Sequence, residues 1–141
     1  MQDLIREVPD FPKPGVVFKD IFPLLENCFQ EVVDELSKKI NAPRAIDYIA
    51  GVESRGFIFA SALAYKLNLG FVPISKKGKL PPPVMSEEIT LEYGQTELEM
   101  APGKGWIVIV DDVMATGGTL LGARNLAVKC GYHVQQILVI V

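Results

Sequence analysis

The chain has 141 residues, of which 49% are hydrophobic and 22% charged, and its net charge is −3. This length allows one domain with one substantial core, and the composition excludes a disordered or low-complexity chain. Because like charges do not gather in blocks and the apolar runs are too short to cross a bilayer, we expect neither a nucleic acid nor a membrane as partner.

The first half of the chain is predicted to contain an amphipathic helix followed by strand, helix and strand. Pro9, Pro12 and Pro14 predict loops or rigid extended arms near the start. From residue 29 to 40, apolar residues recur every three or four positions, which predicts a helix that covers one face of a sheet. The next elements expected are a strand at 46–52, a helix at 56–68 that closes at Gly70, and a strand at 71–75.

The second half is predicted to contain a hairpin and then a further strand–helix–strand unit. Residues 87–100 follow three prolines and alternate apolar and polar side chains, which predicts a polar-faced hairpin or a mobile flap. The nearly uninterrupted apolar run at 106–110 is typical of a strand that is buried on both faces. A helix at 117–131, ending at a glycine, and a strand at 134–141 complete the expected elements.

This alternation predicts an α/β fold with a mostly parallel central sheet flanked by helices. In such a sheet the ligand site lies beyond the carboxyl ends of the strands. Three predicted loops meet this condition, at residues 53–56, 75–79 and 111–119.

The cysteines and the start of the chain indicate a compartment. Cys28, expected in a loop, and Cys130, expected near a helix end, have the spacing of neither a zinc site nor a redox pair, so we expect reduced thiols. The first residues include acidic side chains and lack the apolar core of a signal peptide. We therefore expect a cytoplasmic protein.

The segment VIVDDVMATGGT, residues 108–119, has the most specific composition. Asp111 and Asp112 end an apolar strand, where carboxylates need hydrogen-bond donors such as the vicinal hydroxyls of a sugar. The residues that follow are small or carry hydroxyl groups, so backbone amides at a helix start can converge on an anion. These residues are Ala115, Thr116, Gly117, Gly118 and Thr119. The pattern predicts a site for ribose 5-phosphate; the alternative is an ordinary strand-to-helix turn.

This segment resembles the signature of the type I phosphoribosyltransferases. Three further stretches, at 8–25, 51–64 and 76–99, resemble the adenine phosphoribosyltransferases within that family. The resemblance implies a purine-salvage enzyme that transfers the 5-phosphoribosyl group of 5-phosphoribosyl-1-diphosphate (PRPP) to adenine, giving AMP and diphosphate. It also implies the type I phosphoribosyltransferase fold as a single domain over 1–141, with a hood arm at 1–25, a flexible flap at 80–100, and no counterpart of the family's usual C-terminal segment after Val141.

The resemblance further implies roles for individual residues. Asp111 and Asp112 would bind the ribose hydroxyls, and residues 115–119 the 5-phosphate. The diphosphate would face Glu53, Ser54, Arg55, Lys79 and Tyr93, with Lys76 and Lys77 near Lys79. The groups expected to act in catalysis are Glu92 and Arg55. The adenine would contact Val17, Phe18, Lys19, Val113 and Ala115, and Lys19 stands where the family usually has an arginine. Taken singly, each of these residues also fits a structural role, as a surface charge, a hairpin turn or core packing.

Relatives use Mg²⁺ carried mainly by the diphosphate and ribose oxygens of PRPP, and we expect no metal site built by the protein. The expected partners are small-molecule substrates and a second copy of the chain in a homodimer. Two alternatives share the ribose-phosphate loop. One is salvage of xanthine, guanine or hypoxanthine, and the other is a non-catalytic regulator of the same fold that binds PRPP or a nucleotide.

Overall fold

The computed structural model describes residues 2–41, 45–91, 94–114 and 117–141. The chain forms two compact units, Met1–Lys38 and Lys39–Val141, and each is described by itself. No helix within the described ranges is long and apolar enough to span a membrane.

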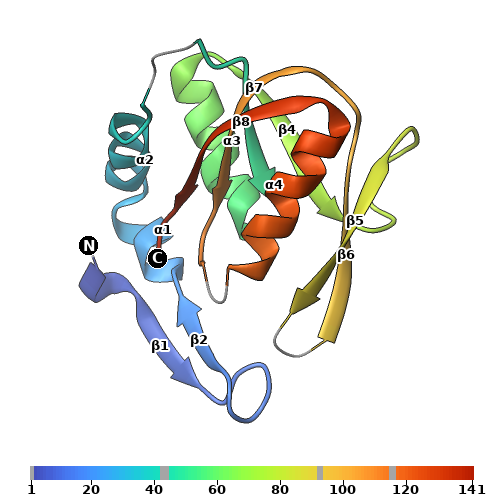
Figure 1. The fold of residues 1–141 in the computed structure, drawn as a ribbon. Helices are drawn as coiled ribbons and strands as arrows, with labels where there is room; N and C mark the ends of the chain where they lie inside the picture. Colours follow the sequence, from blue (N-terminus) through green and yellow to red (C-terminus); the bar gives the residue numbers. More distant parts are fainter. Residues whose placement is uncertain (1, 42–44, 92–93, 115–116) are drawn as a thin grey trace. The chain divides into compact units, whose positions relative to one another are not determined.

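The first unit consists of a β-hairpin and two helices (Figure 1). After a 3-10 helix at Gln2–Leu4, strands β1 (Arg6–Pro9) and β2 (Val17–Asp20) pair in antiparallel register. Helix α1 (Phe22–Asn27) and helix α2 (Phe29–Lys38) follow. The helix predicted at 29–40 is therefore confirmed as Phe29–Lys38, while its place on the face of a sheet stays a prediction. The hairpin and α1 were not predicted: α1 has six residues, too few for a periodic pattern, and its one sequence signal is a proline at its start.

The second unit is a six-stranded sheet with two helices. Its strands lie in the order β5-β6-β4-β3-β7-β8. Strands β4, β3, β7 and β8 run parallel, and the β5–β6 hairpin joins β4 in antiparallel register. The strands are β3 (Tyr48–Val52), β4 (Gly70–Lys76), β5 (Met85–Leu91), β6 (Gly94–Met100), β7 (Gly105–Asp111) and β8 (Tyr132–Val139). The helices are α3 (Arg55–Leu67), between β3 and β4, and α4 (Gly118–Cys130), between β7 and β8.

The two helices cover opposite faces of this sheet (Figure 1). Alternate residues of β3 show the arrangement, because Ala50 and Val52 belong to the core beneath α4. Gly51 faces the other way, where a Cβ atom would lie 2.7 Å from the Cβ of Ala60 in α3. A right-handed crossover on each side of the β3–β7 pair places the helices on opposite faces. The predicted strands and helices of this unit are confirmed, with ends shifted by one or two residues.

The end of α3 differs from the prediction. The helix closes at Asn68, which adopts the left-handed conformation with φ 58° and ψ 44° and donates its N–H to the carbonyls of Ala64 and Tyr65. Gly70, the expected closing residue, is instead the first residue of β4. Asparagine fills the position because it tolerates left-handed geometry better than most residues.

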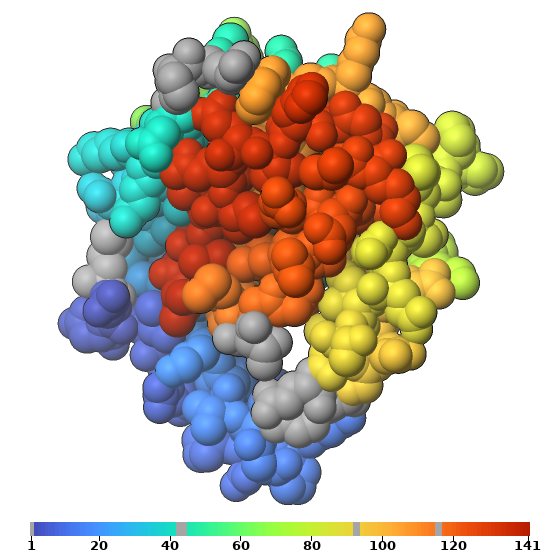
Figure 2. Space-filling view, in the orientation of Figure 1, coloured from blue at the N-terminus to red at the C-terminus, as the bar shows by residue number. Residues whose placement is uncertain are grey.

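The β5–β6 hairpin packs on α4 (Figure 2). Ile89 of β5 is 2% exposed, and it fills the space above Gly122, where a Cβ atom would lie 2.5 Å from its Cγ1. Lys129 of α4 donates to the carbonyl of Ser86 at 2.7 Å and pairs with Glu87 at 2.8 Å. The polar face that the sequence predicted for this hairpin therefore has a buried apolar counterpart that anchors it to the helix.

The thiols lie where they were expected. Cys28 falls between α1 and α2, and Cys130 is the last residue of α4; both are free.

Candidate active site

The carboxyl ends of β3 and β7 meet at the centre of the sheet. From this pair the chain crosses to β4 on one side and to β8 on the other, so the strand order reverses here. Such a switch point leaves a crevice beyond the strand ends, the usual position of ligand sites in open α/β sheets. The predicted diphosphate loop follows β3, and the predicted ribose-phosphate loop follows β7.

Arg55 and the two acids lie together at this point. The Nε atom of Arg55, the first residue of α3, lies 2.8 Å from Oδ2 of Asp112. That oxygen is buried and accepts no hydrogen bond within the described part of the chain, so the contact is an ion pair in which the N–H is not directed at the oxygen. Asp112 therefore keeps acceptor capacity for a further donor, as a hydroxyl of a bound sugar would supply.

Asp111 is protonated more readily than an ordinary aspartate. It is 7% exposed and Asp112 is 5% exposed, and the backbone N–H of Asp112 donates to Oδ1 of Asp111 at 2.8 Å. Burial, followed by a hydrogen bond to the neighbouring Asp112 carboxyl, raises the pKa of Asp111 from 3.8 to about 8. The acid pair thus holds a proton at neutral pH that a bound diol would displace.

Gly56 allows the two loops to approach each other. A Cβ atom at this position would lie 2.8 Å from the carbonyl oxygen of Val110 and 3.1 Å from Oδ1 of Asp111. Both neighbours belong to β7, and one is backbone that cannot move aside. The first turn of α3 therefore reaches the acids only because residue 56 has no side chain.

The predicted phosphate loop leads into the N-terminus of α4. Gly117 is the N-cap and has φ +83°, a conformation that favours glycine. The N–H groups of a first helical turn point out of the helix start and favour an anion there. Gly118 and Thr119 form that first turn, whereas Ala115 and Thr116 lie outside the described residues.

The end of the chain holds the backbone of this loop. Ile140 and Val141 donate their N–H groups to the carbonyl of Asp112 at 3.1 and 2.9 Å, and Met114 donates to the carbonyl of Val141 at 3.1 Å. Val113, predicted to contact the base, lies within this bonded segment and is half-buried.

The predicted diphosphate residues lie on two bonded loops. Glu53 donates its N–H to the carbonyl of Ile74, and its Oε1 accepts the N–H of Lys76 at 3.2 Å. The Glu53–Ser54 peptide bond is cis. The loop after β3 is therefore tied to the end of β4, where the turn that carries Lys79 begins.

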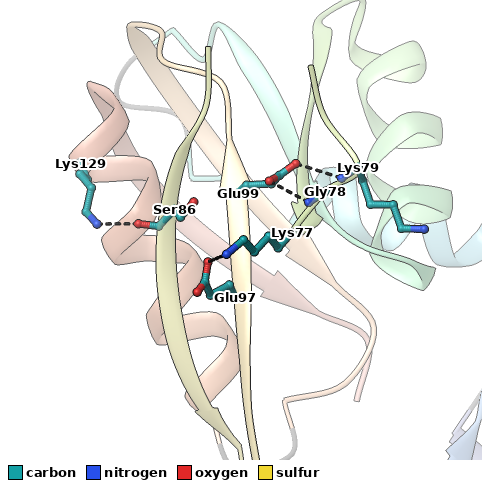
Figure 3. A network of polar contacts seen from close by, with 7 residues as sticks. All are labelled: Lys77, Gly78, Lys79, Ser86, Glu97, Glu99 and Lys129. Atoms are coloured by element: carbon teal, nitrogen blue, oxygen red, sulfur yellow. Dashed lines mark hydrogen bonds and ion pairs between the residues drawn. The ribbon is translucent and has the colours of Figure 1, made fainter. Parts of the chain in front are cut away.

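Glu99, which was not predicted as a site residue, supports this lysine turn. Its buried carboxylate in β6 accepts the backbone N–H groups of Gly78 and Lys79 at 3.0 and 3.1 Å (Figure 3). It also accepts the N–H of Leu80 at 2.7 Å. Lys77 instead pairs with Glu97 at 3.3 Å. Glu99 lies between Leu98 and Met100, whose side chains belong to the core, so it points to the opposite face of the sheet. The alternating pattern marks it only as a polar position, which does not distinguish it from a solvent-exposed glutamate.

The residues predicted to contact adenine from the N-terminal arm lie on the first unit. Val17, Phe18 and Lys19 belong to β2. Lys19 forms an ion pair with Glu7, the residue opposite it on β1, and Phe18 packs edge-on against Phe11 with ring centroids 5.1 Å apart. Glu92 and Tyr93 lie outside the described residues. Among the residues that are described, no three His, Cys, Asp or Glu side chains gather as a metal site.

Comparison with known proteins identifies the family. Residues 25–140 match the sequence model of the phosphoribosyl transferase domain. The adenine phosphoribosyltransferase of Bdellovibrio bacteriovorus is 50% identical over 143 residues, which cover 100% of this chain and 86% of the relative.

Solved structures agree with this match. The adenine phosphoribosyltransferase of Thermoanaerobacter pseudethanolicus has a TM-score of 0.89 at 43% identity, covering 98% of this chain and 83% of that one. The Saccharomyces cerevisiae enzyme, complexed with adenine and D-2,5-dideoxy-2,5-imino-altritol 1,6-bisphosphate, has a TM-score of 0.78 at 34% identity, covering 97% and 86%. The predicted type I fold is confirmed, and the chain belongs to the phosphoribosyltransferase family, in which these relatives are adenine phosphoribosyltransferases.

Proposed function

We propose that this protein transfers the 5-phosphoribosyl group of PRPP to adenine, giving AMP and diphosphate in purine salvage. The observation that carries the proposal is the ion pair between Arg55 and Asp112, with 2.8 Å between Nε and Oδ2. This contact joins the loop proposed for the diphosphate to the loop proposed for the ribose. The names of the relatives and the adenine in the yeast complex support adenine as the base.

Each half of PRPP has a proposed set of partners. The two ribose hydroxyls donate to Asp111 and Asp112, and the 5-phosphate accepts N–H groups from residues 115–119 at the start of α4. The diphosphate lies against residues 53–55 and the Lys79 side chain, with Tyr93 closing over it. The adenine contacts Val17, Phe18, Lys19, Val113 and Ala115.

The proposed reaction breaks the bond between C1 of the ribose and the diphosphate oxygen, and a purine nitrogen then forms the new bond to C1. The positive charge that develops on the sugar is stabilised by the nearby carboxylates, and the charge that develops on the leaving diphosphate is stabilised by Arg55 and Lys79. Glu92 manages the proton that the purine must lose or relocate. Exclusion of water protects the reactive sugar from hydrolysis.

PRPP is proposed to bind together with Mg²⁺. As a hard cation, the ion prefers the oxygens of the diphosphate and the ribose, and it would neutralise part of the leaving group's charge. The buried Oδ2 of Asp112, which accepts no hydrogen bond from the described residues, fits a site that receives hydroxyl donors already carried by the substrate.

The test is to incubate the protein with PRPP, Mg²⁺ and each purine base in turn and to follow nucleotide formation. AMP from adenine is the expected product. Product from guanine, xanthine or hypoxanthine but not from adenine would contradict the proposed base, and PRPP binding without turnover of any base would favour the regulator. The double variant Asp111→Asn, Asp112→Asn should weaken PRPP binding by about tenfold or more, since each hydroxyl loses a charged acceptor.

We also propose that the protein works in the cytoplasm as a homodimer. Both cysteines are free thiols, as expected in a reducing compartment. Ile58 and Tyr65 lie seven residues apart on α3 and are 38% and 90% exposed, so a second copy could cover this apolar stripe. Sedimentation of the wild-type protein and of Tyr65→Glu tests the dimer, and equal monomer fractions would contradict this interface.

A further inference from the structure

Glu99 is a buried carboxylate whose hydrogen bonds converge on one turn. It is 4% exposed, and it lies on β6 next to β4, where it pairs in register with Ser75. Its Oε1 accepts the N–H of Gly78 at 3.0 Å, and its Oε2 accepts the N–H groups of Lys79 and Leu80 at 3.1 and 2.7 Å. Three consecutive amides thus surround one anion, as in a backbone anion nest.

Two backbone hydrogen bonds also hold the turn, from the N–H of Lys77 to the carbonyl of Glu97 at 3.1 Å and from the N–H of Lys79 to the carbonyl of Lys76 at 3.3 Å. Neither fixes the N–H groups of Gly78 and Leu80, and Gly78 adopts φ +89° with open space around it. The pair between Lys77 and Glu97 is on the surface, where ion pairs contribute little. These amides in turn keep the carboxylate charged, since the hydrogen bonds, that from Gly78 first, lower the pKa of Glu99.

The side chain of Lys79 leaves the turn on the side away from Glu99 (Figure 3). Within the described residues its ammonium group has no ion-pair partner. The other end of the turn is bonded to the diphosphate loop, through the N–H of Lys76 and Oε1 of Glu53 at 3.2 Å. The backbone of the turn is therefore fixed at both ends while the lysine charge points outward.

We propose that Glu99 is a positioning residue for the diphosphate: by holding the amides of residues 78–80, it fixes the place of the Lys79 ammonium group. This inference rests on the proposed function, in which the diphosphate is the leaving group. Glu99 does not touch the substrate. It acts through Lys79, and its loss should therefore mimic the loss of that lysine.

The principal variant is Glu99→Gln. A glutamine has one acceptor oxygen, so it must give up the bond to Gly78 or the two bonds to Lys79 and Leu80, and its amino group then faces an N–H donor. We expect the Kd for PRPP, measured calorimetrically with Mg²⁺ and without purine, to rise about tenfold. In turnover, the KM for PRPP should rise by the same factor while the KM for adenine stays unchanged.

Glu97→Gln is the matched control. Glu97 lies on the same strand and contacts the same turn, but through the exposed side chain of Lys77. The Kd for PRPP should stay within about twofold of wild type, because an exposed pair of this kind contributes little. If Glu97→Gln raises the Kd for PRPP as much as Glu99→Gln does, the proposal is overturned. The effect would then follow from the loss of a negative charge anywhere on β6.

A double-mutant cycle separates positioning from general stability. If Glu99 acts through Lys79, Glu99→Gln should raise the Kd for PRPP by less than about twofold in a Lys79→Met background. Multiplicative effects in the double variant would overturn the inference, because they would mean that Glu99 acts independently of the lysine.

Gly78→Ala gives a second route if Glu99→Gln does not fold. A side chain at φ +89° strains the turn without disturbing the buried carboxylate, so the Kd for PRPP should again rise. An unchanged Kd in Gly78→Ala would refute the proposal. These binding measurements need no purine, so the two proposals can fail separately. PRPP binding without AMP formation would contradict only the proposed function. AMP formation together with an unchanged Kd for PRPP in Glu99→Gln would contradict only this inference.

Discussion

PRPP binding should release a proton from the acid pair at neutral pH. The pKa of Asp111 is raised to about 8, chiefly because the side chain is buried and then because it shares a hydrogen bond with Asp112. At pH 7, below that value, most of the protein molecules carry the proton. Sugar hydroxyls need an acceptor, so a bound ribose favours the ionised carboxylate and expels the proton.

The sign of the pH dependence follows from the same value. A carboxyl with a raised pKa stabilises the ligand-free fold at low pH, and this contribution is lost as the pH rises from about 4, the value in the unfolded chain, to about 8. PRPP affinity should change in the opposite direction. It should rise with pH through the neutral range and level off once the pH exceeds the pKa of Asp111, at about 8.

Calorimetry at pH 7 in two buffers with different heats of ionisation measures the number of protons released. The wild type should release more protons than Asp111→Asn, because the asparagine has no proton to lose and the titration of PRPP itself is common to both proteins. Asp111→Asn should also flatten the fall in unfolding free energy between pH 4 and 8. Equal proton release by the two proteins would refute the assignment of the proton to Asp111.

Three further variants test other features. Gly56→Ala places a Cβ atom 2.8 Å from the carbonyl of Val110, and the clash should lower the free energy of unfolding in urea by about 1–3 kcal/mol, less the gain in helix propensity; an unchanged midpoint would contradict the close approach. Gly122→Ala should lower the free energy of unfolding by displacing Ile89, and it should have little further effect in an Ile89→Ala background. Additive losses in the double variant would show that the two residues do not touch. Lys19→Met should change stability by less than about 1 kcal/mol, because its pair with Glu7 is partly exposed, while raising the KM for adenine more than that for PRPP; the reverse order would remove Lys19 from the base site.

The elements that carry the site could be predicted from periodicity. The apolar run before Asp111 and the glycines after it indicated a buried strand and a helix start, and β7 and α4 have those positions. The same logic located Arg55 between β3 and α3. Parallel strands deliver their loops to one edge, so the common edge of the two loops could be predicted. The pairing of β3 with β7, which brings Arg55 to Asp112, could not, because these strands are far apart in the sequence.

Contacts that depend on the backbone of distant segments could not be predicted. Glu99 binds backbone amides about 20 residues earlier in the chain. Nearly every residue type has a backbone N–H group, so the sequence does not indicate which ones bind a distant side chain. Gly56 and Gly122 looked like ordinary helix residues, because their purpose is visible only once β7 and Ile89 stand against them. Asn68 replaced Gly70 as the helix end for a local reason, since both residues tolerate the left-handed conformation.

In the ligand-free site, the positive charge of Arg55 and the negative charge of Asp112 neutralise each other. A simple phosphate or diphosphate that draws Arg55 away leaves the buried carboxylate of Asp112 without a counter-ion, which is costly. At the proposed site, PRPP would avoid this loss, because it would bring hydroxyls for Asp112 on the same molecule as the diphosphate for Arg55. On this assignment the ion pair would disfavour cellular anions that satisfy Arg55 but not Asp112. Asp112→Asn should then narrow the difference in affinity between PRPP and free diphosphate.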